Sequence, residues 1–115
     1  MLLENSMFIS LIRAPAAEVF RFSTTSITPP LGLAYIAGTL ERAGYDFEVI
    51  DAVALAPTQH TQYLRGYLTG LALDEVARRV SPATTVVGIS AIFTHEWPAI
   101  VQLIAILRSF TRTPP

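Results

Sequence analysis

The chain has 115 residues, the length of one ordinary domain, so a second domain is excluded. Hydrophobic residues make up 51% and charged residues only 15%, which excludes a disordered tail. A net charge of -1 argues against nucleic acid as a partner. Because there is no cysteine, disulfides, thiol nucleophiles and iron–sulfur clusters on this chain are excluded.

A membrane partner and an export signal are not expected either. Glycine, proline or a charged residue interrupts every apolar stretch before the roughly 18 residues that a spanning helix needs. The first residues, Met1 to Asn5, lack the basic start of a signal peptide. We therefore expect a cytoplasmic protein.

Three short apolar runs predict strands at 7–12, 47–52 and 85–93, the first and third of them buried on both faces. The Ser/Thr-rich residues 16–28 are expected to form a long loop, and 53–69 a loop with a short amphipathic turn.

Helices are expected between these strands and after the last one. The first begins at Pro29-Pro30 and ends at Gly44, a left-handed cap, and the last runs from Trp97 to Phe110. The predicted buried stripes are Leu33, Ile36, Ala37 and Leu40 in the first helix, Leu73, Val76, Ala77 and Val80 in the second, and Trp97, Ile100, Val101, Ile104 and Leu107 in the third. Trp97 is expected to be a core anchor.

The order β-α-β-α-β-α predicts an α/β fold: a flavodoxin-like, or Rossmann-like, doubly wound parallel sheet of three strands in one domain, residues 7–115. Since such sheets usually have five or six strands, we expect an incomplete sheet whose third strand has an unpaired outer edge. We therefore expect self-association or dependence on a partner.

Ligands of open α/β sheets bind outside the carboxyl ends of the strands, where the strand order reverses. That point lies between the first and third strands, next to Pro29–Leu33 and Ser90–Glu96. Gly32 and Ser90 either admit a ligand there or allow a helix to pack closely on the sheet.

Several motifs carry a family resemblance. The first is Pro29-Pro30-Leu31-Gly32-Leu33-Ala34-Tyr35-Ile36-Ala37, followed by Leu40, Ala43-Gly44-Tyr45 and Val49-Ile50-Asp51-Ala52. The others are Val86-Val87-Gly88-Ile89-Ser90 and the turn with Phe93, Glu96, Trp97 and Pro98. With them the chain resembles the N-terminal cobalamin-binding domain of cobalamin-dependent radical S-adenosylmethionine enzymes. The resemblance implies cobalamin held over the strand ends, with neither a catalytic residue nor a metal ligand from this chain. The implied cofactor-binding residues are Pro30, Leu31, Gly32, Ser90, Ala91, Ile92 and Thr94.

The chain departs from that pattern in two ways. Residues 13–28 contain no histidine, so the motif that ligates cobalt in other cobalamin proteins is missing. The cysteines of the radical domain are also missing, which implies a truncated product or a separately encoded radical domain. The alternative is a non-binding remnant or an α/β interaction domain without a cofactor.

Other catalytic readings are weaker. The two histidines, His60 and His95, match no metal motif. His95 lies at the ligand edge, where it could touch a cofactor, but we expect a plain loop histidine. Ser90 is not in a nucleophile elbow, because the second glycine of that motif is missing.

Overall fold

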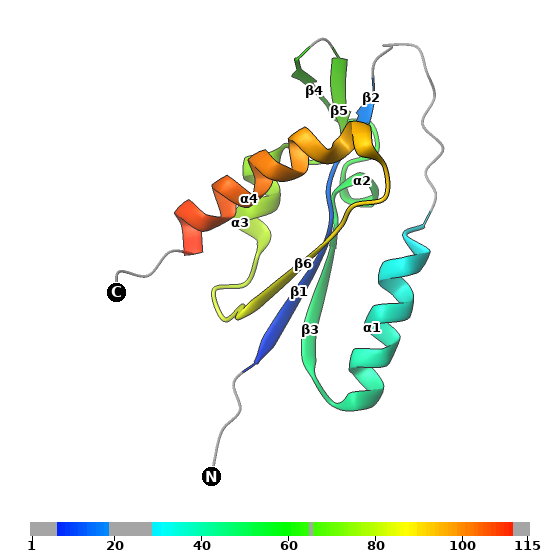
Figure 1. The fold of residues 1–115 in the computed structure, drawn as a ribbon, viewed down its shortest axis with the longest axis vertical. Coiled ribbons are helices and arrows are strands. Elements are labelled where there is room, and N and C mark those ends of the chain that lie inside the picture. Colours follow the sequence, from blue (N-terminus) through cyan, green and yellow to red (C-terminus); the bar gives the residue numbers. More distant parts are fainter. Residues whose placement is uncertain (1–6, 19–28, 65, 112–115) are drawn as a thin grey trace.

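A computed structural model of the chain describes residues 7–18, 29–64 and 66–111, which form two three-stranded sheets (Figure 1). In chain order the elements are β1 (Phe8–Arg13), β2 (Ala16–Glu18), α1 (Leu31–Ala43), β3 (Asp46–Asp51), α2 (Ala52–Leu55), β4 (His60–Tyr63), β5 (Gly66–Thr69), α3 (Leu73–Arg79), β6 (Val86–Ser90), the short 3-10 helix η1 (Thr94–Glu96) and α4 (Trp97–Thr111).

The main sheet is parallel and has the order β3-β1-β6, which confirms the predicted α/β fold with a three-stranded parallel sheet. Helix α1 covers one face, and α3 and α4 cover the other (Figure 1). The central strand β1 is buried from Ile9 to Ile12, as its continuous apolar run predicts. Its successive side chains point to opposite faces of the sheet. Ile9 and Leu11 pack with Leu33 of α1, and Ile12 belongs to the core beneath α3 and α4.

The core between the main sheet and helices α3 and α4 is larger than the one beneath α1. Its buried members are Ile12, Ile50, Ala52, Leu68, Leu71, Leu73, Val76, Ala77, Val80, Ala99, Leu103 and Leu107. All four residues predicted for the stripe of α3 are among them, so that stripe is confirmed.

A polar cluster lies within the main sheet. The buried Ser10 hydroxyl donates to Glu48 Oε2 at 2.6 Å and lies 2.7 Å from the Thr84 hydroxyl. The backbone N–H of Ser81 donates to the same carboxylate oxygen at 2.9 Å. The buried hydroxyl is thereby satisfied, and the segment before β6 is tied to β1 and β3.

The second sheet is antiparallel, has the order β2-β5-β4, and corrects the predicted irregular structure at 16–28 and 53–69. Ala16–Glu18 is a strand, whereas 19–28 lies outside the described residues. Strands β4 and β5 form a hairpin closed by the pair Tyr63 and Gly66. Leu64 at its tip has a φ of 53°, a value that leucine rarely adopts. Without an Asn-Gly or Asp-Gly turn, the sequence lacks the usual hairpin signal.

One hydroxyl joins all three strands of this sheet. Thr69, buried in β5, donates its Oγ1 proton to the Glu18 carboxylate of β2 and lies 3.1 Å from His60 Nδ1 of β4. Because a buried hydroxyl needs such partners, the contacts stabilise the pairing of three short strands.

The predicted stripes of α1 and α4 need correction. Trp97 is 52% exposed and is not a core anchor, and Val101 and Ile36 are also exposed. The residues that α4 buries are Ala99, Ile100, Leu103 and Leu107. The apolar side chains of α4 lie on several of its faces, so more than one apolar stripe fits the helical period. The sequence alone therefore does not show which face is buried.

Strand β6 is less buried than expected. Its side chains are half-buried, and Val86 is 44% exposed, because within the described ranges only β1 pairs with it. Self-association through this edge stays a prediction. None of the helices in the described ranges combines the length and apolar character that a membrane crossing requires.

Gly70 offers a sharp test of the packing between the two sheets. It has a φ of +124°, and a Cβ there would lie 2.6 Å from the carbonyl oxygen of Ala52. Gly70→Ala should therefore lower the free energy of unfolding by about 2–4 kcal/mol. The control is Gly38→Ala in α1, where a Cβ meets nothing within 4 Å. It should raise stability by about 0.5–1 kcal/mol. Urea denaturation measures both, and equal effects would contradict the described packing.

Glu75 ties the start of α3 to the segment before β4. Its Oε1 accepts a hydrogen bond from Gln59 Nε2 at 2.6 Å and from the Ala72 N–H at 2.9 Å. The side-chain bond from Gln59, together with the backbone bond from Ala72, lowers the pKa of Glu75 below its ordinary value.

A lowered pKa makes this contribution depend on pH in one direction. It is fully present above the unfolded-state pKa, about 4.3, and is lost as pH falls through the lower folded-state pKa. The stability difference between wild type and Glu75→Gln should therefore shrink on acidification. Urea denaturation at several pH values measures it, with the exposed Glu41→Gln as control. A difference that grew below pH 4 would contradict the assignment.

Candidate functional site

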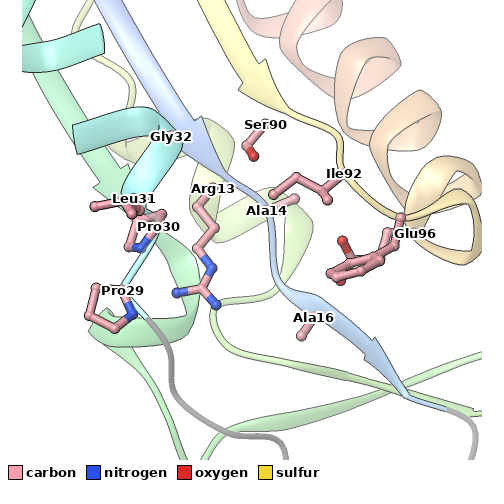
Figure 2. A pocket seen from close by; sticks show the side chains of 11 residues that line it. Arg13, Ala14, Ala16, Pro29, Pro30, Leu31, Gly32, Ser90, Ile92 and Glu96 are labelled. Atoms are coloured by element: carbon pink, nitrogen blue, oxygen red, sulfur yellow. The ribbon is translucent and has the colours of Figure 1, made fainter. Parts of the chain in front are cut away.

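A cavity of about 540 Å³ lies at the carboxyl ends of β1 and β6, next to the start of α1 (Figure 2). Its volume is within the range of small-molecule sites. Most of the lining is apolar, with one serine and two charged side chains. The lining residues are Arg13, Ala14, Ala16, Pro29, Pro30, Leu31, Gly32, Ser90, Ile92, Phe93 and Glu96.

The strand register brings the polar groups of this edge together. Arg13, the last residue of β1, is paired with Asp51 of β3 on one side and with Ser90 of β6 on the other. Arg13 Nη1 lies 3.4 Å from Asp51 Oδ2, and both side chains are at least four-fifths buried, with 20% and 16% exposed. Because Asp51 Oδ1 accepts the N–H groups of Val53 and Ala54, its carboxylate also caps α2.

The first turn of α1 forms the opposite wall. Pro30 precedes the helix without a side-chain cap, and the first turn holds no acidic residue. A Cβ at Gly32 would meet no heavy atom within 4 Å, so the space beside this glycine is open. The neighbouring Leu31 is 64% exposed. This wall therefore presents open apolar surface toward the cavity.

The structure brings five of the seven predicted cofactor-binding residues to this one cavity: Pro30, Leu31, Gly32, Ser90 and Ile92. The other two, Ala91 and Thr94, are not among its lining residues. The binding role of all seven stays a prediction.

The seven predicted binding residues include neither of the charged residues of the lining, Arg13 and Glu96, although Glu96 ends the segment predicted to lie at the ligand point. Arg13 directly follows the apolar run of β1, so the rule that ligands bind at carboxyl ends could have identified it. Glu96 stands in the turn that carried the family resemblance, but nothing in the sequence shows which way its side chain points.

His95 belongs to a second cavity, of about 460 Å³, between the β4–β5 hairpin and the start of α4. It shares that lining with Glu18, Tyr63 and Tyr67, among others, and its ring lies 5.6 Å from that of Phe93. His95 is not among the lining residues of the first cavity, so a contact between His95 and a ligand at the strand ends is not supported. In the described ranges no three His, Cys, Asp or Glu side chains are grouped so that they could hold a metal ion.

The fold and cavity define an α/β domain with a candidate ligand site at the carboxyl edge of a parallel sheet. Comparison with known proteins finds similarity to cytidylyl-2-hydroxyethylphosphonate methyltransferase from Streptomyces wedmorensis, 36% identical over 92 residues. The match covers 75% of this chain but only 17% of that methyltransferase. No family model matches the chain, and no solved structure matches it significantly.

The double role of Asp51 gives a testable consequence. Asp51→Ala removes the acceptor of two α2 N–H groups and the partner of Arg13, so it should lower the free energy of unfolding by about 1–3 kcal/mol. Asp46→Ala, at the exposed start of the same strand, is the matched control and should change it by less than about 0.5 kcal/mol. Urea denaturation compares the two, and equal losses would show that Asp51 does not organise this edge.

Proposed function

We propose that this chain is a cobalamin-binding module of a radical S-adenosylmethionine type enzyme, and that the catalytic domain is not among these 115 residues. One observation carries the proposal: the two motifs that imply a cofactor site, Pro30–Gly32 and Ser90 with Ile92, line a single cavity at the carboxyl edge. The similarity to a methyltransferase supports it.

The residues of the cavity fit a corrinoid in their chemistry. Cobalamin has a broad, largely apolar ring with polar side chains at its periphery. The exposed side chains of Leu31, Ile92 and Phe93 offer apolar surface for such a ring, and Ser90 offers a hydroxyl at the strand end. The open space beside Gly32 allows the ligand to approach the backbone of α1. A cavity of about 540 Å³ holds only part of a ligand this large, so the remainder would lie over the strand ends.

The role of this chain in such an enzyme is to hold and orient the cofactor. Bound cobalamin supplies a cobalt centre that can carry a methyl group. Ser90 donates a hydrogen bond to the cofactor's periphery, while the apolar wall from α1 covers the ring and excludes water from it. Because the sequence has no cysteine, an iron–sulfur cluster must be held by another domain or chain.

The alternative, a remnant or interaction domain that binds no cofactor, is not favoured. A domain without a cofactor does not need Pro30–Gly32 and Ser90 with Ile92 to line one cavity, as they do here.

Binding of cobalamin to the purified chain tests the proposal. After incubation with hydroxocobalamin and gel filtration, corrinoid absorbance should elute with the protein. Ser90→Ala removes one hydrogen bond and should raise Kd about two- to ten-fold, whereas Ser90→Trp should block binding sterically.

The control variants are Ser109→Ala and Ser109→Trp, on the exposed face of α4, which should bind like wild type. Circular dichroism verifies that each variant is folded. If wild type retained no corrinoid, the proposed function would be wrong. If both Ser90 variants bound normally, the site would lie elsewhere.

A further inference from the structure

Two charged side chains line the cavity from different elements. Arg13 comes from the end of β1 and reaches toward Pro29, just before α1, whereas Glu96 comes from η1, on the other side of the segment that runs from β1 to β2 in this view (Figure 2). The contact with Asp51 and the burial of four-fifths of the side chain hold Arg13 in this direction. The cavity thus has a fixed group of hydrogen-bond donors on one wall.

Glu96 is the complementary group. Its residue is half-buried, and among the described residues its carboxylate makes neither a hydrogen bond nor an ion pair. An ionised carboxylate only accepts hydrogen bonds. A partly desolvated acceptor on the wall of a cavity therefore favours a ligand that donates to it.

Charge narrows the class of ligand further. Among the described residues of this edge, Arg13 and Asp51 form an ion pair, and Glu96 adds a further negative charge to the lining. A ligand that carries carboxylates would be repelled by Glu96, and a cationic one would face Arg13. A neutral carboxamide suits both walls, because its carbonyl accepts from a guanidinium and its NH₂ group donates to a carboxylate.

We propose that Arg13 and Glu96 select a corrinoid by the carboxamides at its periphery and reject its carboxylate counterparts. This inference rests on the proposed function, since it concerns the same cavity. It assigns a specificity role to two residues that the resemblance did not single out. Arg13 donates to an amide carbonyl, and Glu96 accepts from an amide NH₂.

Two corrinoids test the selection directly. Dicyanocobinamide carries amides around the ring, dicyanocobyrinic acid carries carboxylates there, and both lack the nucleotide tail. Spectroscopic titration of the 115-residue chain should give a Kd for the cobinamide about ten-fold lower than for the acid.

The variants separate the two walls. Glu96→Gln removes the negative charge but keeps an acceptor, so it should lower the Kd for cobyrinic acid about ten-fold and change that for cobinamide less than about three-fold. Arg13→Met should raise the Kd for cobinamide about ten-fold. Glu41→Gln and Arg42→Met, both exposed on α1, are the matched controls and should leave the two Kd values unchanged.

The outcomes distinguish this inference from the function on which it rests. If wild type bound both corrinoids equally, or if Glu96→Gln did not improve binding of the acid, the selection would be refuted while corrinoid binding stood. If wild type bound neither corrinoid, the selection would fail, and the experiment with hydroxocobalamin would decide the proposed function separately. Glu96→Gln leaves the contact between Arg13 and Asp51 intact, so this variant tests the selection of amides over carboxylates even if Arg13→Met does not fold.

Discussion

The parallel pairing of β1 with both β3 and β6 is the constraint on which the rest of this structure depends. Because β1 lies between the other two strands, its side chains are buried on both faces and are apolar from Ile9 to Ile12 except for the hydrogen-bonded Ser10. Its backbone N–H and C=O groups are satisfied on both edges. The same register aligns Arg13 with Asp51 and Ser90. The candidate site is thus a direct product of strand pairing, since the polar groups begin where the apolar run ends.

The second sheet completes the site from a different direction. Strand β2 follows β1 after only Ala14 and the buried Pro15, so one continuous segment contributes to both sheets. Ala14 and Ala16, on either side of this proline, both line the cavity. Their small side chains leave room at the carboxyl edge, where larger residues would fill the space. The antiparallel sheet therefore forms part of the cavity wall as well as covering the end of the core.

Local patterns predicted the elements whose signals are unambiguous. The apolar run of β1, the stripe of α3 and the left-handed cap at Gly44, with its φ of 83°, follow from period and residue type, and the structure confirms them. The β4–β5 hairpin escaped prediction because its turn lacks an Asn-Gly or Asp-Gly pair, and Leu64 there adopts a backbone angle that its residue type disfavours. For the site, position in the chain was enough to identify the segments that lie at the carboxyl edge of the sheet. The direction of the Glu96 side chain, however, depends on the path of the chain from β6 to η1, which no local sequence pattern encodes.

The join between β1 and β2 has a thermodynamic consequence for any occupant of the cavity. The walls come from both sheets and from α1, so a ligand that touches them contacts three parts of the chain at once. Such a ligand binds only when these parts are folded together, so its binding free energy adds to the free energy of unfolding of the whole described structure. Ligand binding and folding are then thermodynamically linked, and a chain saturated with ligand would unfold in one sharp step.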